Sequence, residues 1–548
     1  MTADERGLIS WVLRHSRLAW MVVGALIALS VYAVRTAPLD AIPDIADPQV
    51  VVYAKWQRSP QLLEEFITAP VVRALLGTPG VESVRATSHM GYSFIYVILS
   101  GAENRPAARQ RIMDRINAIR AQLPSEATIT LGPDAGSMGW IFQYALVDKS
   151  QTRDLRELRL LNERQIKPAL QATPGIADVA SVGGLEKQFQ FRVFPPLLAA
   201  TELTLPQIVT TLRDSFGEVG GRTIEIANRD YQLRGSMNPA DLDRLESIAL
   251  GRDRDGHVVR LKDIGYLQVG YDLRRGIADL DGTGEVVGGI AIMQQGQNVL
   301  AVRAALEHRL AAVRATLPSG VQLLTTYDRS DLIWSTLKAF AETLAYELLV
   351  VVLIVALFLR NLRTAIAPIC VLLLATLFTS LPLAASGHTI NLLSLAGLAI
   401  AIGEMIDATI VIVENCASEL ARQRPADEAG RRAVILQALR AVVRPLMFSL
   451  LIILASFLPI FFLGTREARL FDPLALTKTG AMAFSTLLTV GLLPVLVVWA
   501  FRRYSPNAVR SDESLLVRGY RHALTTVLRW RYVMLGSSLL LMVPAFML

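Results

Sequence analysis

One apolar stretch limits what this chain can be more than any other feature. It runs from Asn391 to Asn415, and about 20 helical residues are enough to cross the hydrocarbon core of a bilayer. The stretch nevertheless contains Glu404 and Asp407 in mid-span. A carboxylate at the centre of a bilayer costs about 2.5–3.5 kcal/mol on insertion scales, so an intramembrane acid indicates a functional site by default. The sequence therefore predicts a membrane protein, and we favour a proton-carrying acid over a structural salt bridge.

Helical periodicity predicts the direction in which each of these side chains points around the helix axis. At about 100° per residue, Met405 points away from Asp407, and Glu404 lies about 60° from Asp407. The line through Asp407 comprises Ala396, Ile400, Gly403, Asp407, Val411 and Glu414. Since small residues allow close helix packing, we expect Ala396 and Gly403 to let a neighbouring helix approach the acid.

The composition predicts a large water-exposed part beside the membrane spans. The chain has 548 residues, of which 52% are hydrophobic and 19% charged, with a net charge of +7. The basic residues gather beside apolar runs, which is typical of membrane topology, and we find no nucleic-acid motif. Cys370 and Cys416 are the only cysteines, so a disulfide framework is excluded. We find neither a nucleophile–base arrangement nor a phosphate loop, so we do not expect an enzyme.

Seven apolar runs predict seven transmembrane helices, the first of them an uncleaved N-terminal helix. They lie at about 18–36, 344–360, 364–386, 390–415, 445–464, 478–501 and 531–548. A cytoplasmic start places the long block 35–339 outside and the arginine-rich connections Ala417–Arg444 and Arg502–Arg529 inside. The positive-inside rule agrees with this threading.

The external block repeats itself. Thr78–Val84 resembles Thr173–Val179, and Arg120–Ser125 resembles Arg314–Ser319. Each first motif lies between a helical and a strand pattern, and each second motif lies between a helix and another strand, which predicts two βαββαβ units.

Spacing predicts an insertion in the second copy. Pro79 and Pro124 are 45 positions apart, whereas Pro174 and Pro318 are 144 positions apart. We place the extra residues near 183–270 and expect a separate β-rich subdomain that contacts a partner. An elaborated loop without a partner remains the alternative.

The expected fold is therefore an α+β membrane protein with seven transmembrane helices and two ferredoxin-like units. The predicted parts are 1–36 with the first helix, 37–134 as the first unit, 135–182 with 271–330 as the second unit, 183–270 as the insert, and 331–548 with the remaining helices.

Several longer stretches carry a family resemblance. They include LDAIPDIADPQVVV (39–52), GPDAGSMGWIFQYALVD (132–148), LAIAIGEMIDATIVIVEN (398–415) and LFDPLALTKTGAM (470–482). Along essentially its whole length the chain resembles the N-terminal half of heavy-metal efflux pumps of the RND superfamily, and is most similar to the copper/silver-type inner-membrane pumps. The resemblance ends in the seventh of twelve helices.

The resemblance implies proton-driven efflux of cations such as Cu(I) or Ag(I) across a bacterial inner membrane, without a cofactor. Asp407 matches a proton-relay aspartate, and Met405 and Met482 match methionines that pass a soft ion. Glu404 stands where those pumps carry a small apolar residue and is a candidate auxiliary carboxylate. The two repeat units match porter subdomains, and the insert matches part of a docking domain.

The resemblance also implies partners. They are a C-terminal half with helices eight to twelve and a second periplasmic block, two further copies in a homotrimer, a periplasmic adaptor protein and an outer-membrane channel.

Departures from the family pattern leave the cargo open. Other methionines of the implied relay fall on Leu273, Leu393, Ile412 and Val497. A pump half for a divalent metal or a small organic molecule is therefore one alternative, and a truncated, non-transporting membrane scaffold is another.

The threading predicts the outcome of a labelling experiment. Single cysteines at Ser236 and Gln423 should react with a membrane-impermeant reagent from opposite sides of the membrane, because the arginines hold the Ala417–Arg444 connection in the cytoplasm. Labelling of both positions from one side would refute the threading.

Overall fold

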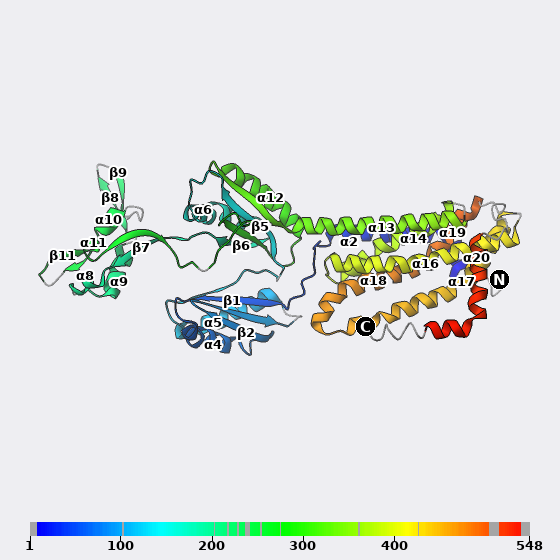
Figure 1. Ribbon diagram of the computed structural model, residues 1–548, viewed down its shortest axis with the longest axis horizontal. Coiled ribbons are helices and arrows are strands. Elements are labelled where there is room, and N and C mark those ends of the chain that lie inside the picture. The colour runs from blue at the N-terminus through cyan, green and yellow to red at the C-terminus, as the bar shows by residue number, and fades with distance from the viewer. Residues whose placement is uncertain are drawn as a thin grey trace. The chain divides into compact units, whose positions relative to one another are not determined.

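The computed structural model describes residues 8–100, 104–136, 138–201, 203–215, 219–226, 229–235, 242–252, 255–274, 276–359, 362–425, 427–503 and 515–538 (Figure 1). The chain divides into two compact units. The helical unit comprises Met1–Ala37 and Leu337–Leu548, and the sheet unit comprises Pro38–Thr336.

The sheet unit begins with a four-stranded antiparallel sheet in the order β2-β3-β1-β4. Its strands are β1 (Gln49–Lys55), β2 (Val81–His89), β3 (Tyr92–Leu99) and β4 (Thr128–Leu131). Alternate residues of β1 are buried, as a strand with one covered face requires. The covering helical segments are α3 (Pro60–Leu63), η2 (Glu64–Thr68), α4 (Ala69–Leu75), α5 (Arg105–Ala118) and η3 (Arg120–Gln122).

A second sheet repeats this plan in the order β14-β5-β13-β6. Its strands are β5 (Trp140–Asp148), β6 (Ile176–Gly183), β13 (Val287–Met293) and β14 (Val321–Asp328). The helical segments are α6 (Leu155–Leu161), η4 (Asn162–Ile166), α7 (Lys167–Gln171) and α12 (Val299–Thr316). Both copies thus have the order strand–helix–strand–strand–helix–strand.

The first repeated sequence motif makes the same turn in each copy. Gly80 and Gly175 have φ values of 83° and 86°, in the left-handed region that favours glycine. The next strand begins immediately after each glycine. A Cβ on Gly175 would also lie 2.5 Å from a methyl group of Val302 in α12. The repeat therefore reflects a backbone conformation that both copies need.

Each copy also contains a π-helical turn that the sequence did not reveal, at Glu64–Thr68 and at Asn162–Ile166. Both turns carry a buried polar residue bonded to the strands. Thr68 Oγ1 lies 2.7 Å from Ser93 Oγ. Asn162 accepts a hydrogen bond from the Tyr144 hydroxyl at 2.7 Å, and burial raises the pKa of Tyr144.

The insertion grows from a two-stranded ribbon, β7 (Lys187–Val193) with β12 (Gly265–Tyr271), that belongs to neither four-stranded sheet. Its further elements are α8 (Pro195–Ala199), α9 (Leu205–Ser215), β8 (Val219–Ile226), β9 (Arg229–Gly235), α10 (Leu242–Glu246), β10 (Ala249–Arg252), β11 (Val258–Arg260) and α11 (Leu261–Ile264). The sequence predicts a β-rich insert and no helices there; α8, α10 and α11 have only four or five residues each, but α9 has 11. Ser236, chosen above for labelling, lies outside the described residues.

Among the described residues, the helical unit has five apolar helices of 17 residues or more and one apolar helix of eight residues. They are α2 (Ser16–Thr36), α14 (Leu362–Phe378), α16 (Leu392–Gln423), α17 (Glu428–Ser456), α18 (Thr465–Gly491) and α19 (Leu493–Ala500). Shorter segments are α1 (Leu8–Arg14), α15 (Ser380–Ala385), η5 (Leu458–Phe462), η6 (Phe501–Arg503) and α20 (Leu515–Arg529), and α13 (Arg329–Leu359) begins in the sheet unit.

Within the described residues, four helical segments are long and apolar enough to cross a membrane, and a fifth is obtained if Glu467–Gly491 and Leu493–Ala500, bent by 52°, form one span. The count of seven is therefore not reached in this part of the chain. The predicted span 344–360 falls at the end of α13, beside the undescribed residues 360–361, and the span 531–548 extends beyond residue 538.

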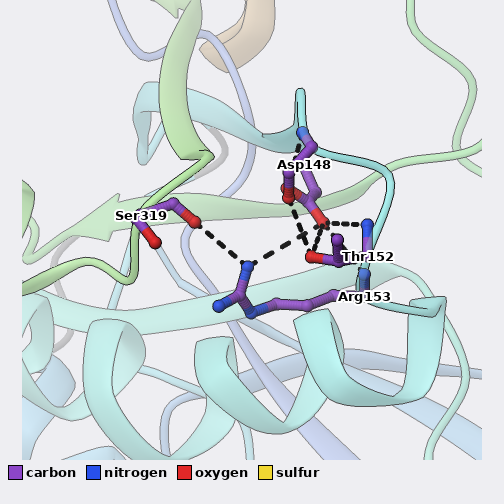
Figure 2. Close-up of polar contacts among 5 residues, drawn as sticks. Asp148, Thr152, Arg153 and Ser319 are labelled. Carbon is purple, nitrogen blue, oxygen red and sulfur yellow. Dashed lines mark hydrogen bonds and ion pairs between the residues drawn. The ribbon is translucent and has the colours of Figure 1, made fainter.

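A polar loop after β5 ties the second copy together (Figure 2). Asp148 accepts hydrogen bonds from the Ser150 hydroxyl at 2.5 Å and from the backbone amides of Ser150, Thr152 and Arg153. These bonds, led by that from the Ser150 hydroxyl, lower the pKa of Asp148 to about 2 despite partial desolvation. Arg153 in turn donates to the backbone oxygen of Ser319, in the second repeated motif.

Because the pKa of Asp148 in the folded protein lies below its ordinary value of 3.8, the stabilisation that this carboxylate provides is fully present above pH 3.8 and disappears as the pH falls through about 2. We expect Asp148→Asn to lower the melting temperature of the chain at pH 7, and the difference from wild type to shrink below pH 3. Asp281→Asn, on an exposed loop of the same copy, is the matched control. An equal deficit at pH 7 and at pH 2 would contradict this account.

Candidate functional site

Helix α16 carries most of the predicted site residues and has a defined start. The Asn391 side chain accepts a hydrogen bond from the Ser394 amide at 3.0 Å, and Ser394 Oγ accepts one from the Asn391 amide at 2.9 Å. This reciprocal pair satisfies amides that the first turn leaves without partners. The helix continues to Gln423, beyond the predicted end at Asn415.

Helices α16 and α18 lie side by side (Figure 1). They are in close contact at Gly397, where a Cβ would lie 2.4 Å from both Leu474 O and Thr477 Oγ1. No larger residue fits there without separating the helices. The expectation for Gly403 was wrong within the described residues, because a Cβ there would meet nothing within 4 Å. The small residue that admits a neighbour, Gly397, lies about 80° around the helix from Asp407.

The two faces of α16 have different surroundings. Met405 is 1% exposed and belongs to the apolar core of the helical unit. Asp407 is exposed, and so are Ile400 at 51% and Val411 at 43%, on the line that periodicity predicts. The exposed line therefore faces away from every described helix.

Asp407 makes no hydrogen bond or ion pair with any residue that the structure describes. An unpaired carboxylate in an apolar span is costly unless it is hydrated, protonated or paired. The geometry leaves it accessible to water or to another polypeptide.

Glu404 has a partner that the sequence interpretation did not find. Its Oε1 lies 2.8 Å from Nζ of Lys478 in α18. The Lys478 side chain is 3% exposed and that of Glu404 is 34% exposed. The ammonium also lies 3.6 Å from the centre of the Phe457 ring, a cation–π contact. Glu404 Oε2 is buried and accepts no hydrogen bond from the described residues.

Lys478 is visible in the sequence as a charged residue beside an apolar run. The predicted span 478–501 began at this lysine, which made it look like a flanking residue. The helix instead begins at Thr465, so Lys478 lies in its middle. A lysine in that position needs a counter-ion, and the pairing with Glu404 supplies one.

The structure buries both candidate methionines in one core. Met405 and Met482 are each 1% exposed and belong to the same cluster of buried side chains in α16 and α18. Ile412 and Val497 belong to the same cluster, whereas Leu273 is 65% exposed in the sheet unit. Among the described residues, no group of three or more His, Cys, Asp or Glu could hold a metal ion. The soft ligands in this core are the thioether sulfurs of Met405 and Met482 and the thiol of Cys416.

Comparison with known proteins places this geometry in a family. A model of the AcrB/AcrD/AcrF family matches residues 8–548. The chain is 38% identical over 535 residues to the cation efflux system protein CusA of Escherichia coli (strain K12), covering 95% of this chain and 51% of the relative. It is 30% identical over 533 residues to the cobalt-zinc-cadmium resistance protein CzcA of Cupriavidus metallidurans, covering 92% of this chain and 50% of that protein.

A solved structure agrees. The crystal structure of a heavy metal efflux pump superposes with a TM-score of 0.74 at 28% identity, covering 97% of this chain and 52% of the pump. The chain thus spans about half the length of the relatives that it matches.

The family model extends over nearly the whole chain, and the relatives are cation-efflux and metal-resistance proteins that match in both sequence and fold. The resemblance inferred from the motifs is confirmed: this chain belongs to the AcrB/AcrD/AcrF family and is similar to its heavy-metal efflux pumps.

Proposed function

We propose that this chain is the N-terminal half of a proton-driven exporter of heavy-metal cations in a bacterial inner membrane. Asp407 is the proton carrier in this proposal, and Met405 and Met482 pass a soft monovalent ion such as Cu(I) or Ag(I). The observation that carries the proposal is the division of α16 into an exposed face with Asp407 and a buried face with Met405.

The position of Asp407 suits proton transfer. A proton carrier must exchange with water, and its contact with any cation must be reversible. Asp407 has no partner among the described residues, whereas Glu404, one helical turn away, is bound to Lys478. The two carboxylates therefore have different tasks, and only Asp407 is free to change its charge.

The methionines suit a soft cargo. Thioether sulfur binds Cu(I) and similar ions and is a poor ligand for hard cations. Met405 and Met482 come from the two most closely packed helices of the unit. Gap filling is the commoner role of buried methionine, so the ligand role needs a direct test.

In this proposal, the exposed line of α16 is the surface that contacts a partner. A C-terminal half with five further helices and a second periplasmic block would cover Asp407 and supply its cationic partner. In the same proposal the sheet unit lies in the periplasm. Its two βαββαβ copies act as porter subdomains, and the ribbon-borne insert docks in a trimer that works with an adaptor protein and an outer-membrane channel.

A second candidate cargo is a divalent metal ion. Leu393, Ile412 and Val497 replace methionines that the resemblance implies, which weakens the relay for a soft ion. The similarity to a cobalt-zinc-cadmium resistance protein points the same way. A small organic cargo and a non-transporting scaffold remain further alternatives.

The proton-carrier role predicts the phenotype of Asp407→Asn. When the C-terminal half is co-expressed, we expect this variant to lose pH-gradient-driven metal efflux, because an amide keeps the shape but does not take up and release a proton. In the chain without its C-terminal half, the unfolding free energy should change by less than about 0.5 kcal/mol, since the side chain is exposed there. A structural ion pair would instead cost about 3–5 kcal/mol.

Glu414→Gln, on the same exposed line, is the matched control and should keep its flux. The wild-type chain without a C-terminal half should not transport. A fully active Asp407→Asn protein would end the proton-carrier hypothesis.

The cargo role predicts a different result for Met405→Ile. We expect Ag(I) flux in vesicles to fall by about tenfold or more, the scale on which metal affinity responds to loss of a supporting contact, while proton coupling of the remaining flux persists. Met447→Ile, in α17, controls for loss of a partly buried methionine. Equal Ag(I) flux in Met405→Ile and wild type, or a selective loss of Zn(II) flux, would favour the divalent alternative.

A further inference from the structure

We propose that Glu404 is the fixed counter-ion of Lys478, and that this pairing keeps the space around Met405 and Met482 electrically neutral so that a cation can enter it. The consequence for cations rests on the proposed function, whereas the pairing itself does not. The inference assigns a specificity-determining role to Lys478, which no sequence argument had included in the site.

The geometry of Lys478 demands compensation. Its side chain is 3% exposed, and its ammonium has Glu404 Oε1 at 2.8 Å and the face of Phe457 at 3.6 Å. Removing one partner of a buried pair leaves an uncompensated charge, which is far more costly than never having had the pair. The face of an aromatic ring attracts a cation but carries no net charge, so it does not replace a carboxylate.

The pair is adjacent to both methionines along the helices. Glu404 directly precedes Met405, and Lys478 lies four residues before Met482 in α18. Side chains at this i, i+4 spacing have Cβ atoms about 5–6 Å apart. For a charge separation of about 6 Å and an effective dielectric constant of about 20, an unpaired ammonium weakens the binding of a monovalent cation about a hundredfold, and by less at a larger separation. A paired ammonium presents a dipole, and most of this repulsion disappears.

The pairing also explains the second acid in the span. Asp407 lies on the exposed face, so it is not placed to neutralise a lysine in the core between α16 and α18. Without Glu404, the described part of the core would hold the ammonium of Lys478 with only an aromatic ring beside it. Glu404 is therefore expected to act through Lys478, as a positioning residue for charge, and not as a second proton carrier.

A double-mutant cycle on the full-length chain in detergent tests the pairing. Glu404→Gln should lower the melting temperature, and Glu404→Gln combined with Lys478→Met should recover most of that loss, because no charge then remains unpaired. The matched control is the exposed pair Lys338 and Glu342, 3.9 Å apart with side chains 78% and 56% exposed, whose cycle should show no coupling. Additive losses at 404 and 478 would overturn the pairing.

Ag(I) binding to the same proteins tests the consequence. Glu404→Gln should weaken Ag(I) binding by tenfold to a hundredfold, and the double variant should return to within about threefold of wild type. Glu404→Asp, which keeps the charge, should bind more tightly than Glu404→Gln and serves if the latter fails to fold. A double variant as weak as Glu404→Gln would overturn the charge argument.

A wild-type chain that binds no Ag(I) would refute both the methionine assignment and the cation consequence. The thermal cycle would still decide the pairing, so failure of the proposed function and failure of the ion pair are distinguishable.

Discussion

Close contact between α16 and α18 sets the position of every side chain in the candidate site. Gly397 allows this contact, since a Cβ there would collide with the α18 backbone at Leu474. From that point the helical repeat places Met405 in the core and brings Glu404 within 2.8 Å of Lys478. A residue larger than glycine at 397 would therefore shift the helices between which this ion pair lies. In this part of the structure, the packing of the two helices therefore determines which charges are paired.

The cost of charge in apolar surroundings explains why two neighbouring carboxylates differ. A buried acid survives in such a place when it is paired, and an exposed acid survives when it is hydrated or covered by a partner. Glu404 is paired with Lys478, whereas Asp407 is exposed. A rotation of about 60° around one helix thus separates a fixed charge from a variable one. That separation is what an exporter coupling protons to cations would need, and a simple structural salt bridge does not require it.

The sheet unit contains two similar βαββαβ copies, and the second copy keeps its fold although it carries a large insertion. In each copy a polar residue of a π-helical turn, Thr68 or Asn162, is bonded to strand side chains inside the core. Buried polar groups of this kind are costly unless they find their partners, so they favour one arrangement of helix and sheet. The insertion leaves through the β7–β12 ribbon, whose paired ends close the gap in the chain. Long insertions are tolerated at such points because the entropy of loop closure grows slowly with length.

Sequence periodicity alone determined the direction of side chains around each helix axis. It separated Asp407 from Met405, and the repeated motifs located both βαββαβ copies and the point of insertion, because these are local patterns or comparisons within one chain. It did not reveal Lys478 as the partner of Glu404, Gly397 as the contact point, or the helices within 183–270. A periodic pattern specifies which way a residue faces but not which element lies opposite, and the partner depends on helix packing between segments distant in the chain. Only the tertiary structure, by placing α18 against the buried face of α16, decided which charge is paired and which stays free.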